Sequence, residues 1–203
     1  MIGKTALTLI AGASLLLGGT VVAEPNGAEL AKKCERCHGK NGNSDKKQVP
    51  SIAGFSAAYF TDTMKAYKKG DRQADKFKTE GHDETDMKAI AESFDEKDLT
   101  ALGEYFAAQT FEPRQQDFDS RLARKGKKVH KKRCRKCHTS KGSDPDDDAG
   151  ILAGQWMPYL ESQLEQFFNG KRTTQPKKMK KQMKKLNKDE DVPALLHFFA
   201  SQQ

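Results

Sequence analysis

The 203-residue sequence contains only four cysteines and one tryptophan, and only 35% of its residues are hydrophobic. All four cysteines stand in two Cys-x-x-Cys-His motifs, which leaves none for a framework of disulfides. No stretch alternates polar and apolar residues for long enough to predict a strand. So little apolar surface would stabilise two small domains poorly, and we expect a cofactor to fill part of the core.

Long apolar runs are also absent after residue 23. The first 23 residues combine a positive start at Lys4, an uncharged apolar run at residues 5–17 and small residues up to Ala23. This pattern predicts a signal peptide cleaved after Ala23, so we expect an exported, periplasmic protein. The alternative is a membrane anchor, but the apolar run is short for a span and rich in glycine and alanine. We therefore expect no membrane span after cleavage.

Acidic residues are scarce in the second half only. Residues 24–116 contain 15 Lys and Arg against 17 Asp and Glu, a net of −2, whereas residues 117–203 contain 20 against 11, a net of +9. Such an asymmetry favours a partner with an acidic surface. Nucleic acid would also attract this charge, but an exported protein rarely meets it, and we expect no nucleic-acid partner.

The sequence repeats itself with an offset of one hundred residues. The matched positions are Cys34, Cys37 and His38 with Cys134, Cys137 and His138, Gly42 with Gly142, Gly54 with Gly154, and Gly70 and Arg72 with Gly170 and Arg172. Beyond these positions the second half is shorter by seven or eight residues, so that Phe106 corresponds to Phe199. The repeat predicts two tandem domains, residues 24–112 and 113–203.

Capping residues predict that both domains are helical. Helices are expected at residues 56–70 and 158–170, each ending at a glycine, and at residues 95–109 and 191–201, each beginning at an aspartate. The sequence therefore predicts an all-α fold.

The two motifs, CERCH at residues 34–38 and CRKCH at residues 134–138, have the spacing that attaches haem c. Two thiols on one helical turn can each add to a vinyl group, and the histidine that follows can bind the iron. A shared zinc site would leave both histidines unexplained and would join the halves instead of repeating in each. A thioredoxin-like pair needs a βαβ context, and disulfides between such close cysteines are strained. The predicted cofactors are two covalently bound haem c groups with iron.

Each iron then needs a sixth ligand, and methionine is the usual choice for electron transfer. Met87 and Met179 have apolar residues at the same spacings after them, four and seven positions on, and precede Phe106 and Phe199 by 19 and 20 residues. We predict that these two methionines are the sixth ligands, with His82 and Met183 as second choices. The other candidates are interpreted as packing or surface residues: Met64, Met157, His130 and His197.

Each half resembles a class I cytochrome c domain, and the tandem resembles the dihaem cytochromes, most closely the cytochrome subunit of flavocytochrome c sulfide dehydrogenase. The resemblance rests on FEPRQQDFDSRLARKGKKVHKKRCRKCH, ILAGQWMPYL and FFASQQ in the second half, and on CERCHGKNGNS and PSIA in the first. In that family the thiols, proximal histidine and distal methionine correspond to Cys34, Cys37, His38 and Met87, and to Cys134, Cys137, His138 and Met179. A proline carbonyl often faces the proximal histidine there; Pro50 matches, but Gly150 stands at the second position, where its carbonyl could serve.

This resemblance implies a periplasmic heterodimer. An FAD-containing flavoprotein would oxidise sulfide, and this chain would pass the electrons to a small soluble acceptor. We expect that acceptor to have an acidic surface, because lysines and arginines surround the second motif and Met179. The main alternative is a free periplasmic dihaem shuttle, serving a terminal oxidase or another sulfur-oxidising enzyme. A haem enzyme such as a peroxidase would need one iron to lose its methionine. Closed, six-coordinate irons argue for a carrier and not an enzyme.

Overall fold

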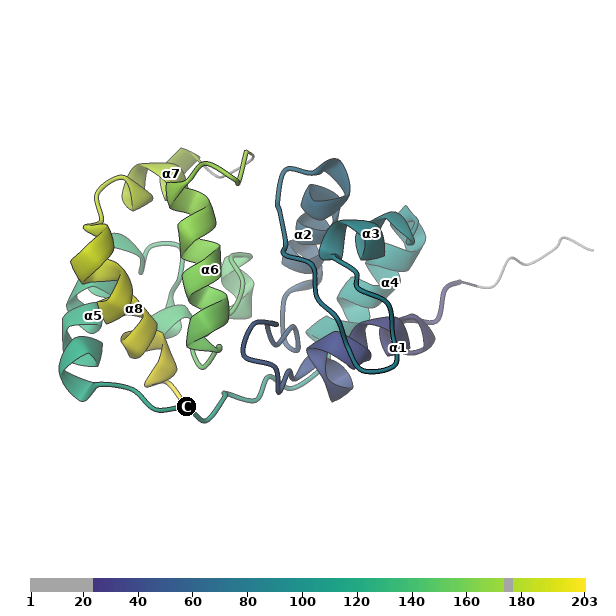
Figure 1. Ribbon diagram of the computed structural model, residues 1–203, viewed down its shortest axis with the longest axis horizontal. Coiled ribbons are helices and arrows are strands. Elements are labelled where there is room, and N and C mark those ends of the chain that lie inside the picture. The colour runs from purple at the N-terminus through teal and green to yellow at the C-terminus, as the bar shows by residue number, and fades with distance from the viewer. Residues whose placement is uncertain (1–23, 174–176) are drawn as a thin grey trace, which may run out of the picture.

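The computed structural model describes residues 24–173 and 177–203, so the predicted signal peptide at residues 1–23 lies outside the described residues. Figure 1 shows two helical lobes side by side, and the described chain contains no strand beyond an isolated bridge between Phe77 and Thr85. The all-α prediction is confirmed. Within the described ranges, no helix is both long enough and apolar enough to cross a membrane.

The two lobes have corresponding helices. The N-terminal lobe contains α1 (Gly27–His38), α2 (Ala57–Lys69), α3 (Met87–Glu92) and α4 (Glu96–Ala107), with a short 3-10 helix at Lys40–Gly42. The C-terminal lobe contains α5 (Ser120–Arg133), α6 (Met157–Phe168), α7 (Lys177–Met183) and α8 (Lys188–Ala200), with 3-10 helices at Ser140–Gly142 and Pro145–Asp147.

Most of the predicted helix ends are found. The Ser56 hydroxyl accepts from the Tyr59 amide at the start of α2, and Gly70 ends that helix in the left-handed conformation, with φ at 77°. Asp95 caps α4 in a capping box with Asp98.

The predicted start of the last helix at Asp191 is wrong. Helix α8 begins at Lys188, because the Asn187 side chain accepts from the amides of Asp189 and Glu190. The Asp191 carboxylate lies within the first turns and accepts from the Asn187 amide at 2.9 Å. Helix α6 also ends slightly early, at Phe168 with Asn169 as its cap, so that Gly170 follows the cap.

Each lobe is built on one close helix crossing, and a glycine makes each crossing possible. A Cβ on Gly27 of α1 would lie 2.4 Å from the Ala101 carbonyl oxygen of α4, and one on Gly126 of α5 would lie 1.9 Å from that of Ala194 in α8. Any larger residue would push the two backbones apart. These crossings hold α1, whose last turn carries the first motif, and α5, which precedes the second motif, against the last helix of the same lobe.

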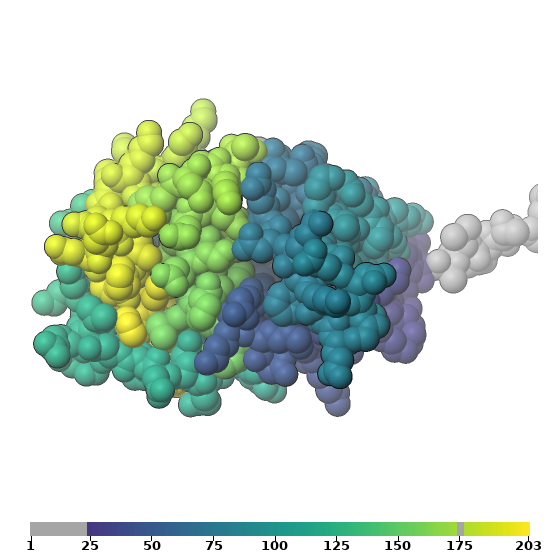
Figure 2. All heavy atoms as spheres, viewed as in Figure 1, coloured from purple at the N-terminus to yellow at the C-terminus, as the bar shows by residue number. Residues whose placement is uncertain are grey.

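The lobes are packed against each other. Figure 2 shows the atoms of α6 directly against the N-terminal lobe. Ile151 is 5% exposed and packs in the hydrophobic core of the N-terminal lobe although it belongs to the second half of the chain. The connecting segment is held as well, since the Arg114 amide donates to the Gly154 carbonyl at 2.8 Å. The two halves therefore share buried surface.

Candidate haem sites and the interface between them

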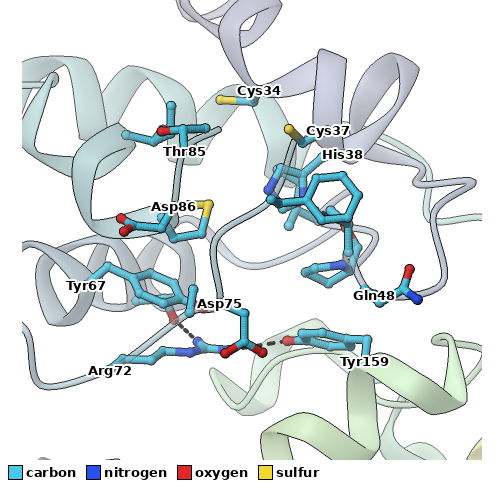
Figure 3. Close-up of a pocket in the computed structure, with 18 of the residues that line it drawn as sticks. Cys34, Cys37, His38, Gln48, Tyr67, Arg72, Asp75, Thr85, Asp86 and Tyr159 are labelled. Atoms are coloured by element: carbon cyan, nitrogen blue, oxygen red, sulfur yellow. Dashed lines mark hydrogen bonds between the residues drawn. The ribbon is translucent and has the colours of Figure 1, made fainter. Parts of the chain in front are cut away.

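The N-terminal lobe contains a cavity of about 270 Å³. Figure 3 shows Cys34, Cys37 and His38, which enter it from α1. Met87 lines it from the start of α3. Its apolar lining also comes from these side chains: Ile52, Phe55, Phe60, Met64, Tyr67 and Ile90. The cavity thus brings the predicted thiols, histidine and methionine of the first half to one apolar space.

His38 is fixed by one hydrogen bond. Its Nδ1 lies 2.9 Å from the Pro50 carbonyl oxygen, and because a carbonyl can only accept, Nδ1 carries the proton. The tautomer leaves the lone pair on Nε2 for a metal. Burial lowers the pKa of His38, and the bond to Pro50 opposes that shift in part. The expectation that Pro50 faces the proximal histidine is confirmed.

The two thiols of the first motif are carried by α1. Both are free, and burial raises the pKa of Cys34 to about 12. They lie on the last turn of α1, which ends at His38. The alternative of a shared metal site finds no support, since the described His, Cys, Asp and Glu side chains form no group of three or more that could hold an ion.

Met87 and the second choice, His82, lie in different surroundings. Met87 is half-buried, begins α3 and lines the cavity, with Asp86 as the N-cap before it. His82 is exposed, is absent from the cavity lining, and its Nδ1 lies 3.1 Å from the Arg36 guanidinium. Met64, interpreted as packing, is 3% exposed within the core and also lines the cavity.

The second motif is built differently from the first. Helix α5 ends at Arg133, before the motif, and residues 134–138 continue as turns in which the His138 amide bonds to the Cys134 carbonyl. Burial raises the pKa of Cys134 to about 11 and lowers that of His138 to about 4. The first motif lies within a regular helix, whereas the second is closed by a single hydrogen-bonded turn after the end of α5.

The expected role of the Gly150 carbonyl is not found. Nδ1 of His138 is buried and has no hydrogen-bond partner among the described residues. Gly150 instead packs against Tyr59 of the other lobe, where a Cβ would lie 2.6 Å from the tyrosine ring. A proline at this position would collide with that ring.

His130, which was interpreted from the sequence as a packing or surface residue, is hydrogen-bonded to the second motif. It is 5% exposed, its Nε2 lies 2.9 Å from the His138 carbonyl oxygen, and its ring packs 5.1 Å from that of Phe198. Its position one helical turn before Cys134 could have indicated this contact. His197, by contrast, accepts from the Asp119 amide at 3.0 Å and has a local structural role.

The two methionines of α7 differ in burial. Met179 is half-buried, whereas Met183, the second choice, is 4% exposed. Residues 174–176, which lead into this helix, lie outside the described residues. Met157 packs with Trp156 against the core of the C-terminal lobe, as interpreted from the sequence.

A buried cation lies between the lobes. Arg72 is 7% exposed and donates to Thr63, to the Tyr159 hydroxyl at 3.2 Å and to Gln163 Oε1 at 2.7 Å, the last two from α6 of the other lobe (Figure 3). Arg172, its repeat counterpart, bonds to the same Gln163 oxygen.

Arg72 makes no ion pair in the described part of the chain, and its Nε has no partner. A buried guanidinium with only neutral partners is costly and favours a carboxylate nearby. The carboxylates of haem meet this need, so the lining fits that cofactor in charge as well as in polarity. The repeat matched Arg72 with Arg172, but no sequence pattern indicated that both bind the Gln163 side chain.

The second half presents a strongly basic surface, here called the basic face. All of its residues except the half-buried Arg133 are exposed. They are Lys127, Lys128, Lys131, Lys132, Arg133, Arg135 and Lys136 around the second motif, and Lys177, Lys178, Lys180, Lys181, Lys184 and Lys185 around Met179. Figure 1 places α5 on the side of the C-terminal lobe that faces away from the N-terminal lobe.

The sequence profile of the family Cytochrome c matches residues 25–109 and 123–203, one match in each lobe. The chain belongs to the cytochrome c family. Each of its two cytochrome c domains binds a covalent haem c with its iron.

Curated relatives match most of the chain. Cytochrome c-552 of Acidithiobacillus ferridurans is 30% identical over 177 residues, covering 83% of this chain and 74% of the relative. Cytochrome c4 of Azotobacter vinelandii is 28% identical over 184 residues, covering 84% of both. The crystal structure of reduced cytochrome c4 from Pseudomonas stutzeri has the same fold, with a TM-score of 0.71, 23% identity and coverage of 87% of this chain and 97% of that one. The chain is thus a dihaem, cytochrome c4-like electron-transfer protein.

Proposed function

We propose that this chain carries electrons through two six-coordinate haems, one held by Cys34, Cys37, His38 and Met87 and the other by Cys134, Cys137, His138 and Met179. The observation that carries the proposal is the apolar cavity that Cys34, Cys37, His38 and Met87 line together. The second set follows from the repeat. We also keep residues 24–112 and 113–203 as the two domains, the first 23 residues being a signal peptide for export to the periplasm.

Haem iron supplies reversible one-electron chemistry when bound. Pro50 orients His38 by its carbonyl, and the thiols of Cys34 and Cys37, with His38 and Met87, would hold the haem and leave its iron closed to substrates. The apolar lining excludes water, and Arg72 supplies a buried positive charge at the edge that faces the other lobe. A closed site leaves no position for a substrate, so the chain itself is proposed to be a carrier and not an enzyme.

The basic face is proposed to receive the electron acceptor. Its lysines are exposed and surround the second motif and Met179, so a small soluble acceptor with an acidic surface would be attracted there. This arrangement would place electron exit at the C-terminal domain.

For the donor, the sequence segments at residues 111–138 and 151–160 support an FAD-containing flavoprotein of the sulfide dehydrogenase type. This chain would then be the haem subunit of a sulfide-oxidising flavocytochrome c. The second candidate is a free periplasmic dihaem shuttle between another sulfur-oxidising enzyme and a terminal oxidase. The similarity to cytochromes c4 and c-552 over most of their length supports an electron carrier and does not distinguish between the two candidates.

One purification separates the two donors. The native protein is isolated from its own periplasm and tested for a stoichiometric flavoprotein and for reduction of both haems by sulfide. A bound flavin subunit with sulfide-dependent reduction supports the flavocytochrome. A dihaem protein that purifies alone and is not reduced by sulfide removes the flavoprotein proposal and leaves the shuttle.

A further inference from the structure

The loop that carries Pro50 is hydrogen-bonded to residues of the other domain. Ser51, directly after Pro50, is fully buried, and its amide donates to Gln155 Oε1 at 3.0 Å. Gln155 Nε2 donates in turn to the Ser51 carbonyl at 2.6 Å. Gln155 is also fully buried. One side chain of the C-terminal domain therefore satisfies both backbone groups of the residue next to the His38 acceptor.

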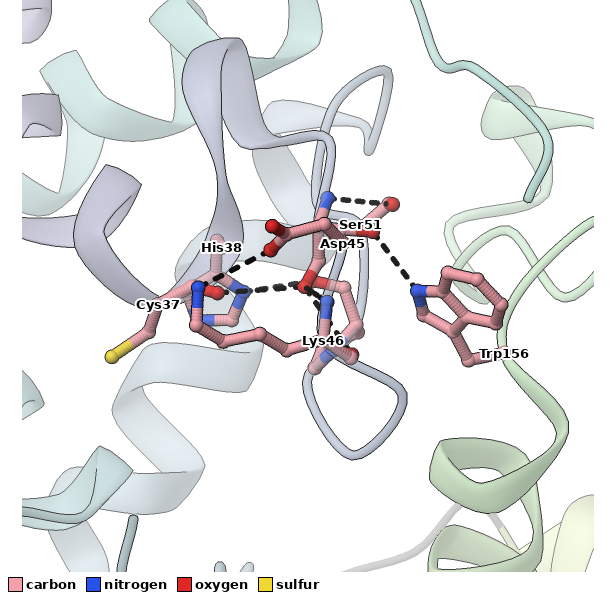
Figure 4. Close-up of polar contacts among 8 residues, drawn as sticks. Cys37, His38, Asp45, Lys46, Ser51 and Trp156 are labelled. Atoms are coloured by element: carbon pink, nitrogen blue, oxygen red, sulfur yellow. Dashed lines mark hydrogen bonds and ion pairs between the residues drawn. The ribbon is translucent and has the colours of Figure 1, made fainter. Parts of the chain in front are cut away.

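Two more bonds hold the same loop. Trp156 Nε1 donates to the Ser44 carbonyl at 2.9 Å (Figure 4), and the Tyr159 amide donates to the Lys47 carbonyl at 3.1 Å. Inside the loop, the Ser44 amide donates to the Ser51 hydroxyl at 3.0 Å, and this closes the loop upon itself. Residues 155–159 thus form hydrogen bonds to backbone groups of residues 44–51, and we call this set of bonds the clamp.

The reverse arrangement has no corresponding hydrogen bonds to the loop backbone within the described ranges, although Ile151 packs in the core of the N-terminal lobe. The matching loop of the C-terminal domain, at residues 144–151, is contacted by the Ser56 hydroxyl, which donates to the Asp148 carboxylate at 2.5 Å, and by the Tyr59 ring packed on Gly150. Phe55, the repeat counterpart of Gln155, has no polar group with which to bind a backbone. Across the described chain, hydrogen bonds to the loop backbone therefore run from the C-terminal domain to the N-terminal domain, as in the clamp, and not the other way.

We propose that Gln155, with Trp156, is a positioning residue for the haem of the other domain. By fixing the loop at Ser51 it holds the Pro50 carbonyl against His38 Nδ1, so the reduction potential of the N-terminal haem depends on the C-terminal domain. The inference rests on the ligand assignment given under the proposed function. Its physical basis is that a hydrogen bond to Nδ1 makes the imidazole a stronger donor and favours oxidised iron.

The test is a redox titration of the dihaem holoprotein with the substitution Gln155→Met, which keeps the length of the side chain and removes both hydrogen bonds. A looser Pro50–His38 bond should raise the potential of the N-terminal haem and leave that of the C-terminal haem unchanged. We expect the electron equilibrium between the haems to shift about two- to tenfold toward the N-terminal haem. A tenfold shift corresponds to about 59 mV for a one-electron couple. The Ser51 amide should also exchange its hydrogen faster.

Two further variants make the test specific. Trp156→Phe removes only the hydrogen bond to Ser44 and should raise the potential of the N-terminal haem by less than Gln155→Met does. If Gln155→Met does not fold, this variant replaces it in the test. Thr173→Val removes a different bond between the domains, the one to the Asp71 carboxylate at 2.7 Å, and should change neither potential.

The outcomes distinguish the inference from the proposed function. If both haems bind normally and give two reversible steps, but neither Gln155→Met nor Trp156→Phe moves the N-terminal potential, the positioning role is overturned and the carrier function stands. A shift confined to the C-terminal haem would overturn it equally. A wild-type protein without two reversible steps would instead remove the proposed function.

Discussion

Nδ1 of His38 lies 2.9 Å from the Pro50 carbonyl oxygen, whereas Nδ1 of His138, its repeat counterpart, has no partner among the described residues. The stronger donor, His38, should favour oxidised iron, and the +9 net charge of residues 117–203 should favour reduced iron in the C-terminal domain. We therefore predict a lower reduction potential for the N-terminal haem. Spectroelectrochemical titration, with the haems assigned by the variants below, measures both. A lower potential for the C-terminal haem would contradict this reasoning.

Replacing either axial methionine should lower one potential only. Histidine is the harder ligand and stabilises oxidised iron, so Met87→His should lower the N-terminal potential and Met179→His the C-terminal one. The change should be on the order of 0.1 V, since axial ligands set haem potentials over about 0.8 V.

Met64→Leu and Met183→Leu are the matched controls, because both side chains are buried. Met64 is interpreted as a packing residue, and Met183 is the second choice of ligand, so its variant also tests the assignment of Met179. Neither should change a haem spectrum. A loss of methionine ligation in Met183→Leu, with Met179→His silent, would move the second ligand to Met183.

Removing the buried charge at the interface should lower the potential of the N-terminal haem. Arg72→Met takes away a cation that lines the cavity, and a positive charge disfavours oxidised iron. The control is Lys76→Met, since Lys76 lines the same cavity but its side chain is 69% exposed and its charge is screened by water. Redox titration of the two variants compares them. An equal change in both would show that burial of the Arg72 charge is unimportant.

Charge reversal on the basic face should slow electron delivery to an acidic acceptor. The double substitution Lys178→Glu and Lys181→Glu should reduce the association rate about tenfold at low salt, with a smaller effect at high salt. Lys69→Glu is the control, because Lys69 is exposed on the N-terminal domain. Stopped-flow oxidation of the reduced protein measures the rates. Lys69→Glu changes the net charge by half as much as the double variant, so a change in the logarithm of the rate half as large would mean that only net charge matters.

The sequence predicted the parts that depend on local chemistry. Ser56, Gly70 and Asp95 end or begin helices as expected because capping is decided within a few residues. The prediction that Asp191 begins the last helix is wrong for the same reason, because Asn187 caps that helix four residues earlier. The bond from His38 to Pro50 was expected from the resemblance and is found.

The interface was not predictable in this way. Whether Gln155 meets Ser51, or Tyr59 meets Gly150, depends on how two finished domains pack, and no periodicity in the sequence records that packing. The single tryptophan and the matched arginines were visible as residues, but their partners lie about one hundred positions away in the chain.

The most direct test of the central claim is a redox titration of the purified holoprotein, followed by exposure of the reduced form to carbon monoxide. A closed dihaem carrier should contain two covalently bound haems, give two reversible one-electron steps, and show no rapid change of spectrum with carbon monoxide. Rapid binding at either haem would reveal an open iron and contradict the account.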